Sequence, residues 1–130
     1  QLLGVRGFPG NSINHKNSIF IPNHSKKTFV EGEVDMVSGM GYKNKELSNG
    51  IFEIKRVITN LGVFDFNGKN NCMQLLSLHP NVSVDDVIAN TGFEIAIQSD
   101  SITSMPSNEE LVLIREVLDP QGIRNTIFGE

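Results

Sequence analysis

A glycine-rich segment near the start of the chain carries the residues best suited to chemistry. In Gly4-Val5-Arg6-Gly7-Phe8-Pro9-Gly10-Asn11, glycines surround one arginine. Glycine lets backbone N–H groups approach a ligand closely, and a guanidinium beside them stabilises a carboxylate, a phosphate or a developing oxyanion. We predict that Arg6 stabilises negative charge in catalysis, and that the substrate-binding residues beside it are Gly7, Gly10 and Asn11. The alternative is a solvated or salt-bridged surface arginine.

Two further segments extend this candidate site. Asn14 and His15 follow the glycine-rich segment, and His15 can donate a hydrogen bond to a substrate. The alternative is a loop histidine bonded to a backbone carbonyl. Ser38-Gly39-Met40-Gly41 follows a predicted strand, and ligands in open α/β sheets gather at the carboxyl ends of strands. We therefore predict that Gly39 and Gly41 bind substrate, with a plain turn as the alternative.

Other chemically capable side chains are predicted to have structural roles. Cys72 is the single cysteine, so no internal disulfide forms, and its place before an apolar segment favours a small buried side chain over a nucleophile. Asp85 and Asp86 are adjacent on a predicted helix, where they suit the positive N-terminus but do not face each other. His24 and His79 have no carboxylate or cysteine at ligand spacing, so no metal site is predicted.

The composition is typical of one globular domain, residues 1–130. Hydrophobic residues make up 38% and charged residues 20%, and no run approaches the roughly 20 apolar residues needed to cross a bilayer. The net charge is −4 and the 11 Lys and Arg residues are scattered, so neither nucleic acid nor a membrane is an expected partner. The single cysteine fits a reducing cytoplasm.

The first part of the chain is predicted to be irregular. Short strands are expected at residues 2–5, 18–21, 28–30 and 34–37, separated by loops rich in Gly, Pro and Asn. The polar residues 43–50 predict an exposed loop. Because a first strand without a partner exposes backbone N–H and C=O groups, we expect a piece of a longer protein or one half of an assembly.

From residue 51 onward the hydrophobic pattern is regular. Residues 51–59 alternate between apolar and polar, which predicts a half-exposed strand with Phe52, Ile54 and Arg56 on one face. A strand is also expected at residues 63–66. The Asn67-Gly68 dipeptide then predicts a type I′ hairpin turn, and residues 73–78 complete an antiparallel meander.

A first helix is predicted near residues 84–91. Ser83 is its expected N-cap, with Asp86 at the third helical position, and Gly92 is the expected C′ residue that ends it. A strand is expected at residues 93–97.

A second helix is predicted over residues 108–118, opened by Ser107 and Glu110 as a capping box. Its apolar stripe, expected to pack on the sheet, consists of Leu111, Ile114, Val117 and Leu118. Residues 119–130 are expected to be poorly anchored. The predicted fold class is α/β, a mixed and partly antiparallel sheet covered by two short helices.

In its order of elements, the segment from Val57 to Ile97 resembles the closing part of the B (beta) subunit of family I CoA-transferases. The likeness is strongest over residues 51–97 and corresponds to the C-terminal half of such a subunit. It implies a CoA-transferase-like fold, a coenzyme A thioester as substrate and no bound cofactor. It also implies acyl-CoA and a CoA-transferase A (alpha) subunit as partners in a homo- or hetero-oligomer.

A steroid ring-opening branch of this superfamily, whose members are acyl-CoA hydrolases, is similar in Gly4-Val5-Arg6-Gly7 and in the Asn14-His15 pair. The resemblance places that branch's active-site arginine at Arg6. Transferases have a Met-Gly-Gly-like segment in the neighbouring region, from which this sequence departs.

The transferase reaction begins when a glutamate of the B (beta) subunit attacks the thioester. The resemblance places this glutamate in a glutamate-glycine loop of the subunit's N-terminal half. That loop does not include any glutamate of this sequence that we considered, namely Glu31, Glu33, Glu46, Glu53 and Glu94, so we expect the isolated chain to be inactive. Three readings follow: part of a CoA-transferase, part of a ring-opening acyl-CoA hydrolase, or a non-catalytic interaction remnant.

Overall fold

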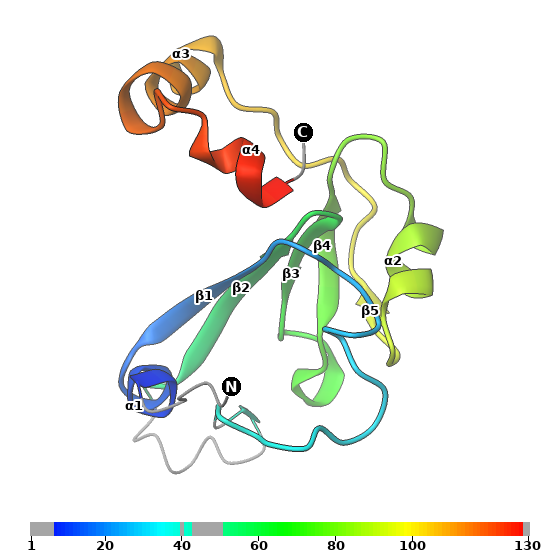
Figure 1. Ribbon diagram of the computed structural model, residues 1–130. Coiled ribbons are helices and arrows are strands. Elements are labelled where there is room, and N and C mark those ends of the chain that lie inside the picture. The colour runs from blue at the N-terminus through cyan, green and yellow to red at the C-terminus, as the bar shows by residue number, and fades with distance from the viewer. Residues whose placement is uncertain (1–6, 40, 43–50, 129–130) are drawn as a thin grey trace.

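The computed structural model describes residues 7–39, 41–42 and 51–128 (Figure 1). The strand predicted at residues 2–5, the loop predicted at residues 43–50 and Arg6 lie outside the described residues. None of the described helices is long and apolar enough to cross a membrane.

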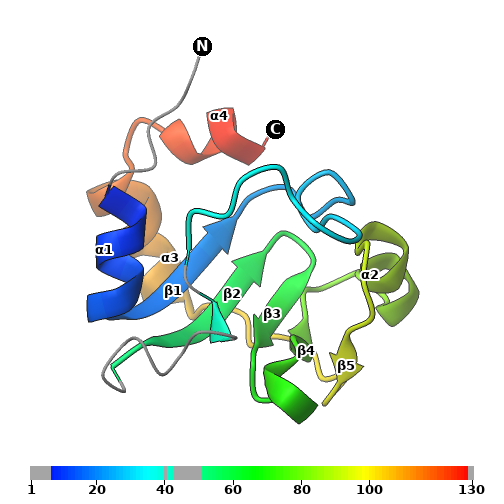
Figure 2. The ribbon, with the colours of Figure 1, turned by 90° about the horizontal axis from the view of Figure 1, so that it is seen from below.

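Five strands form one mixed sheet in the spatial order β1-β2-β3-β4-β5 (Figures 1 and 2). Their bounds are β1 (Lys16–Ile21), β2 (Glu53–Thr59), β3 (Gly62–Asp65), β4 (Gln74–Leu78) and β5 (Ala96–Ile97). β1 pairs with β2 in parallel, β4 pairs with β5 in parallel, and β2, β3 and β4 form an antiparallel meander. The predicted α/β class with a mixed, partly antiparallel sheet is confirmed.

A β-bulge in β2 changes which side chains face the core. Asn17 of β1 lies opposite Ile54, whereas Ser18 lies opposite Arg56, so Lys55 is an extra residue. An extra residue reverses the alternation of side chains beyond it. Lys55 and Arg56 are therefore both exposed and Val57 is buried. The prediction that Arg56 shares a face with Phe52 and Ile54 is wrong for this reason.

The β3–β4 connection is longer than the predicted two-residue turn. The carboxylate of Asp65 accepts hydrogen bonds from the backbone N–H of Asn67 at 3.1 Å and from its side-chain amide at 2.6 Å. The next residue, a glycine, has φ −60°, and a short helix, η2 (Lys69–Asn71), follows it. The left-handed residues are Asn70 and Asn71, at φ 59° and 57°, so the type I′ turn at Asn67-Gly68 is wrong.

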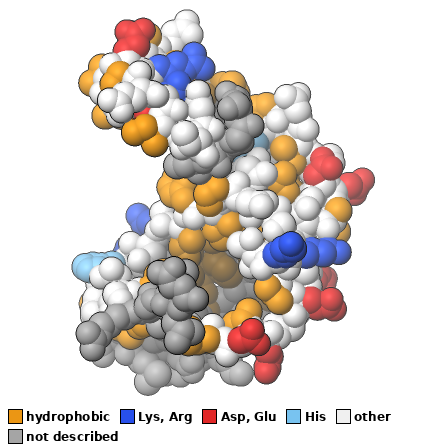
Figure 3. Space-filling view, viewed as in Figure 1, with side chains coloured by type: hydrophobic (Ala, Val, Ile, Leu, Met, Phe, Trp, Pro, Cys, Tyr) orange, Lys and Arg blue, Asp and Glu red, His pale blue; other side chains and the backbone are white. Residues whose placement is uncertain are grey.

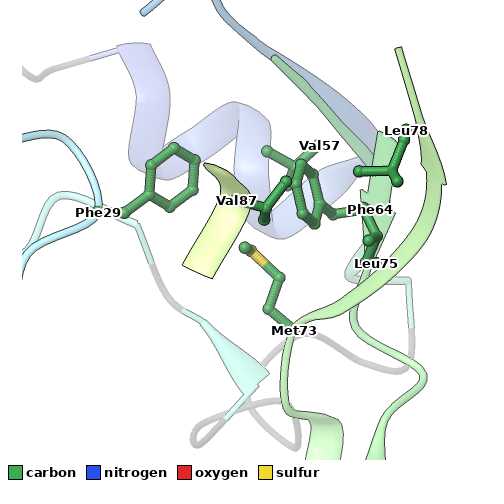
Figure 4. Close-up of a cluster of buried hydrophobic side chains, with 7 residues drawn as sticks. All are labelled: Phe29, Val57, Phe64, Met73, Leu75, Leu78 and Val87. Carbon is green, nitrogen blue, oxygen red and sulfur yellow. The ribbon is translucent and has the colours of Figure 1, made fainter. Parts of the chain in front are cut away.

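One face of the sheet holds the hydrophobic core (Figure 4). Its buried side chains come from three central strands, from the helix α2 (Val84–Asn90) and from the chain on either side of these elements: Phe29, Val57, Phe64, Met73, Leu75, Leu78 and Val87. Burying one such side chain contributes about 1.5–3 kcal/mol. α2 and the segment that carries Phe29 therefore form the layer that covers this face.

The strand predicted at residues 28–30 is instead a turn. The N–H groups of Thr28 and Phe29 both donate to the carbonyl of Ser25, at 2.9 and 2.8 Å. This turn inserts the Phe29 ring into the core. The strand predicted at residues 34–37 is also wrong, because all four residues are exposed and none pairs with the sheet. Apolar residues there gave a strand-like pattern without a buried face.

α2 begins and ends as the sequence indicates, but Gly92 has a different role. Ser83 Oγ accepts a hydrogen bond from the Asp86 N–H at 3.1 Å, and the Asp86 carboxylate accepts one from the Ser83 N–H at 2.9 Å, which confirms the capping box. Gly92 follows the C-cap Thr91 but is not left-handed. Its N–H donates to the Phe29 carbonyl at 2.8 Å. Gly92 is required for this close approach of two backbones.

We expect Ser83→Ala to lower the free energy of unfolding by about 1 kcal/mol, because the first turn of α2 loses a side-chain acceptor for its N–H groups. Hydrogen bonds that the Ser83 hydroxyl and N–H donate to the Asp86 carboxylate hold the pKa of Asp86 below its usual value, so the share of the cap that depends on the charged carboxylate is present near neutral pH and is lost as the pH falls through that lowered pKa. Urea unfolding at pH 7 measures the effect. Ser104→Ala, at an exposed position outside any helix, is the control; equal losses in both variants would contradict the cap.

The last helices form an arm that extends away from the sheet (Figure 1). They are α3 (Asn108–Val112), the π-helix η3 (Leu113–Leu118) and α4 (Ile123–Phe128). The Ser107–Glu110 capping box is confirmed, with Ser107 Oγ accepting from the Glu110 N–H at 3.2 Å. The predicted packing of this helix on the sheet is wrong, because Val117 and Leu118 are 65% and 71% exposed. A capping box fixes where a helix begins but not which surface it meets.

Local hydrogen bonds cap the last helix of this arm. The Asp119 carboxylate accepts hydrogen bonds from the N–H groups of Ile123 and Arg124, at 2.7 and 3.0 Å, and forms an ion pair with the Arg124 guanidinium at 2.8 Å. These contacts, led by the backbone hydrogen bond from Arg124, lower the pKa of Asp119. These contacts lie within the arm itself, so the poor anchoring expected for residues 119–130 stays a prediction.

Candidate functional site

The predicted glycine-rich loop is a helix from residue 7 onward. α1 (Gly7–Asn14) lies beside β1 at the edge of the sheet (Figure 2). Pro9 is tolerated because it lies in the first turn, where its missing N–H has no intrahelical partner. Two side chains bond to carbonyls of the same helix: Ser12 Oγ donates to Pro9 at 2.9 Å, and Asn14 Nδ2 donates to Gly10 at 2.9 Å. These local bonds stabilise a helix that its two glycines obscure in the sequence.

The second glycine segment contacts this helix. A Cβ added to Gly39 would lie 2.8 Å from Cε1 of Phe8, so the Phe8 ring covers Gly39. Gly41 is left-handed, at φ 65°. Tyr42 then ties the segment to β2: its hydroxyl accepts from the Ile54 N–H at 3.0 Å and lies 3.3 Å from the Ile54 carbonyl. The two predicted glycine segments therefore adjoin at one corner of the sheet, although neither follows the carboxyl end of a strand.

We call α1 with residues 38, 39, 41 and 42 the α1 corner. Gly7, Gly10, Asn11 and Asn14 lie on α1, and all four are exposed. His15 follows the helix and is also exposed, and its carbonyl accepts from Asn17 Nδ2 at 2.7 Å.

An ion pair lies next to the α1 corner. Lys16 Nζ is 2.8 Å from the Glu53 carboxylate, and this contact raises the pKa of Lys16. It joins the first residues of β1 and β2. Both side chains are well exposed, so the pair contributes little to stability.

A cavity that the sequence did not reveal lies at the other end of β1 and β2. It has a volume of about 500 Å³ and is lined by Phe20, Ile21, Pro22, Ile58, Thr59, Asn60 and His79. β1 and β2 run in parallel and end here, and ligands in open α/β sheets bind outside such carboxyl ends. Phe20 is 72% exposed beside it, a large aromatic surface open to solvent. We call this space the strand-end cavity.

A buried histidine lies behind the strand-end cavity. His24 is 3% exposed, and its ring stacks on Phe29 with centroids 4.0 Å apart. Thr91 Oγ1 donates to the Val87 carbonyl, so it accepts from Nε2–H of His24, 2.9 Å away. Nδ1 is then the acceptor for the Thr59 hydroxyl at 3.1 Å. Both ring nitrogens are satisfied in the neutral form.

Burial disfavours the charged imidazolium and lowers the pKa of His24 from 6.5 to about 4. His24 therefore stays neutral near pH 7 and fastens the segment after β1 to β2 and to the end of α2. It is a structural residue. The sequence predicted a turn at His24. Its burial depends on Thr59 and Thr91, which lie far along the chain and contact it only in the folded protein.

His79 belongs to a second network at the wall of the strand-end cavity. Its Nε2 lies 2.9 Å from the Thr59 carbonyl, which can only accept, so Nε2 carries a proton. Its Nδ1 lies 3.1 Å from Thr103 Oγ1, which in turn lies 2.8 Å from Ser77 Oγ. These bonds fix the imidazole ring as a wall of the cavity.

The prediction that Cys72 is buried is wrong. Its N–H bonds to the Lys69 carbonyl at 3.1 Å at the end of η2, before β4 begins, and its side chain is exposed. It borders a cavity of about 300 Å³ together with Lys69 and Glu94. Within the described part of the chain, no group of three or more His, Cys, Asp or Glu residues could hold a metal ion.

Comparison of the sequence with known proteins identifies relatives along nearly the whole chain, although no protein-family model matches it. The cholesterol ring-cleaving hydrolase IpdB subunit of Rhodococcus jostii RHA1 is 46% identical over 129 residues, which cover 96% of this chain and 51% of that protein. The B (beta) subunit of glutaconate CoA-transferase from Acidaminococcus fermentans is 29% identical over 112 residues, covering 82% and 42%. The chain spans about half the length of the curated relatives it matches.

Solved structures give the same relationships. The crystal structure of Rhodococcus jostii RHA1 IpdAB matches with a TM-score of 0.90 and 43% identity, over 100% of this chain and 54% of the other. Glutaconate coenzyme A-transferase from Acidaminococcus fermentans matches with a TM-score of 0.80 and 25% identity, over 98% and 49%. The decarboxylase AibA/AibB, at 24% identity and a TM-score of 0.69 over 88% and 43%, shares the fold.

Proposed function

We propose that this chain, which belongs to the CoA-transferase-like family that includes IpdB and the B (beta) subunit of glutaconate CoA-transferase, forms part of a protein that opens a ring of an acyl-CoA with water. The observation that carries the proposal is the difference in identity, 46% to the ring-cleaving hydrolase against 29% to the transferase. Proteins that differ at fewer positions more often share the same substrate pocket, so the higher identity to the hydrolase favours ring opening over CoA transfer.

Two residues that flank α1 in the sequence support the same proposal. Arg6 immediately precedes α1, and His15 immediately follows it. An arginine in contact with a ring carbonyl would stabilise the negative charge that develops when hydroxide attacks it, and the family resemblance assigns this role to Arg6. The assignment of Arg6 as this group, and of the α1-corner glycines and asparagines as substrate contacts, stays a prediction.

Hydrolytic ring opening has a definite balance of atoms. Hydroxide from water forms a bond to a ring carbonyl carbon, the adjacent ring C–C bond breaks, and the departing carbon takes up the proton. The product is an open-chain carboxylate, heavier by one water, that still carries coenzyme A. A CoA-transferase would instead move coenzyme A to a second carboxylic acid through a glutamate of the protein.

CoA transfer is the second candidate function, and the relationship to glutaconate CoA-transferase supports it. In both cases we propose an A-type subunit as the partner, because the relative IpdB is named as a subunit and its crystal structure is that of IpdAB. We also propose that the isolated chain is inactive. The proposed substrate is a coenzyme A thioester, and the proposed location is the cytoplasm.

The experiment that tests the proposal uses the protein that carries this chain, purified with its A-type subunit. A ring ketone bearing an acyl-CoA group is supplied with and without acetate as a CoA acceptor, and products are identified by mass. We expect gain of one water with coenzyme A retained, independent of acetate. Formation of acetyl-CoA would favour the transferase. No reaction, together with separate elution of the two proteins in size-exclusion chromatography, would favour a non-catalytic remnant.

A further inference from the structure

The strand-end cavity is large enough for a small ligand and lies where the fold places ligands. Its volume of about 500 Å³ falls within the roughly 300–1,000 Å³ typical of small-molecule sites. It opens at the carboxyl ends of the parallel strands β1 and β2. Figure 3 shows hydrophobic side chains gathered on the surface below the helical arm, in the region where these strands end.

The chemistry of its wall selects an uncharged ligand. Among the described residues that line the cavity there is no Lys, Arg, Asp or Glu. Aromatic and aliphatic side chains form most of the wall, with Phe20 and Ile58 contributed by the two strands. A charged group, such as a phosphate or a carboxylate, would lose its hydration here without gaining a partner.

The Thr59 and His79 side chains of the wall are already engaged, and Asn60 Oδ1 accepts a hydrogen bond from the His24 N–H at 2.8 Å. The Thr59 hydroxyl bonds to His24 and accepts N–H groups from Leu61 and Gly62 at 3.0 and 3.3 Å. Both nitrogens of His79 are likewise occupied, by the Thr59 carbonyl and by Thr103. Thr59 and His79 therefore present the carbon faces of their side chains to the cavity and are held in place by the networks behind them. Such a rigid, apolar wall suits a rigid ligand, which loses little conformational entropy on binding.

We infer that the strand-end cavity binds the uncharged hydrocarbon ring portion of the substrate, with Phe20 covering it. The inference rests on the proposed function and specifies the part of the substrate that this end of the sheet recognises. Phe20 is exposed without a ligand, and a saturated ring seated against its face would remove that apolar surface from water. In this arrangement Phe20 and Ile58 determine specificity and take no part in the chemical step.

The test measures binding of 2-decalone, an uncharged bicyclic ketone, to the chain by saturation-transfer NMR. The chain contains no tryptophan, so Phe20→Trp also provides a fluorescence signal at the cavity. We expect saturable binding to the unsubstituted chain, and about tenfold weaker binding by Phe20→Ala, because part of the apolar contact is lost. At 72% exposure, Phe20 can be truncated without removing a buried contact.

Met36→Ala is the matched control, since Met36 is 63% exposed and lies outside the cavity lining, and its affinity should equal that of the unsubstituted chain. Equal affinity of Phe20→Ala and Met36→Ala, or equally strong binding of myo-inositol, would overturn the inference. Binding of 2-decalone is measured without turnover, so this result tests the cavity independently of the ring-opening assay. If the complex opens rings but Phe20→Ala leaves KM unchanged for ring-bearing substrates, the inference fails and the proposed function survives.

Discussion

Replacing Gly92 by alanine should destabilise the protein by about 3 kcal/mol, because the added methyl group has no space. A Cβ at this position would lie 2.5 Å from both the Glu31 nitrogen and the Phe29 carbonyl oxygen. These are backbone atoms, which cannot rotate away as a flexible side chain would. The clash would also break the hydrogen bond from the Gly92 N–H to the Phe29 carbonyl, which holds the Phe29 turn against the end of α2.

The control for this prediction is Gly10→Ala. No atom lies within 4 Å of a Cβ built on Gly10, and the residue lies inside α1. Alanine favours a helix over glycine by up to about 1 kcal/mol, so this variant should be neutral or slightly more stable. Urea unfolding of both variants measures the difference. A Gly92→Ala protein as stable as Gly10→Ala would show that the two backbones do not approach as described.

Replacing His24 by alanine should cost about 3 kcal/mol at pH 7. The substitution leaves a cavity beside Phe29 and Phe64 and removes a partner from the hydroxyls of Thr59 and Thr91. His15→Ala, at an exposed histidine, should change stability by less than about 0.5 kcal/mol. Equal losses in the two variants would contradict a buried, doubly bonded His24.

The same histidine predicts a pH dependence with a definite sign. Folding lowers the pKa of His24 from 6.5 to about 4, so the unfolded chain binds a proton more readily. The stabilising contribution is complete above pH 6.5 and is lost as the pH falls towards 4. It should amount to roughly 2 kcal/mol between pH 8 and pH 5. Unfolding free energies over this interval should fall for the unsubstituted protein and for His15→Ala. The loss specific to His24 should be absent from His24→Ala; the same slope in all three would contradict the assignment.

Those elements of the fold that depend on local chemistry could be predicted from the sequence. Alternating side chains predicted β2, apolar segments predicted β3 and β4, and the serine–carboxylate spacing predicted both capping boxes. The predictions failed where a contact with a distant part of the chain determines the local structure. The bulge at Lys55 reflects pairing with β1, and the role of Gly92 reflects the Phe29 turn. The exposed face of the helical arm shows that an amphipathic stripe does not specify its partner.

The candidate site was predictable only in part, for the same reason. The sequence singled out both glycine segments, and Phe8 against Gly39 brings them together, but a helix replaced the expected loop. The strand-end cavity escaped prediction because Phe20 and His79 lie far apart in the chain and meet only after β1 and β4 join the same sheet. A hydrophobic residue at the exposed end of β1 was its only local sign.

The most direct test of the ring-opening proposal is the fate of the oxygen of water. The protein that carries this chain, in complex with its A-type subunit, is incubated with a ring ketone bearing an acyl-CoA group in water labelled with oxygen-18. We predict one labelled oxygen atom in the new carboxylate of an open-chain product that still carries coenzyme A. An intact ring without label, with coenzyme A transferred to an added carboxylic acid, would contradict the proposal.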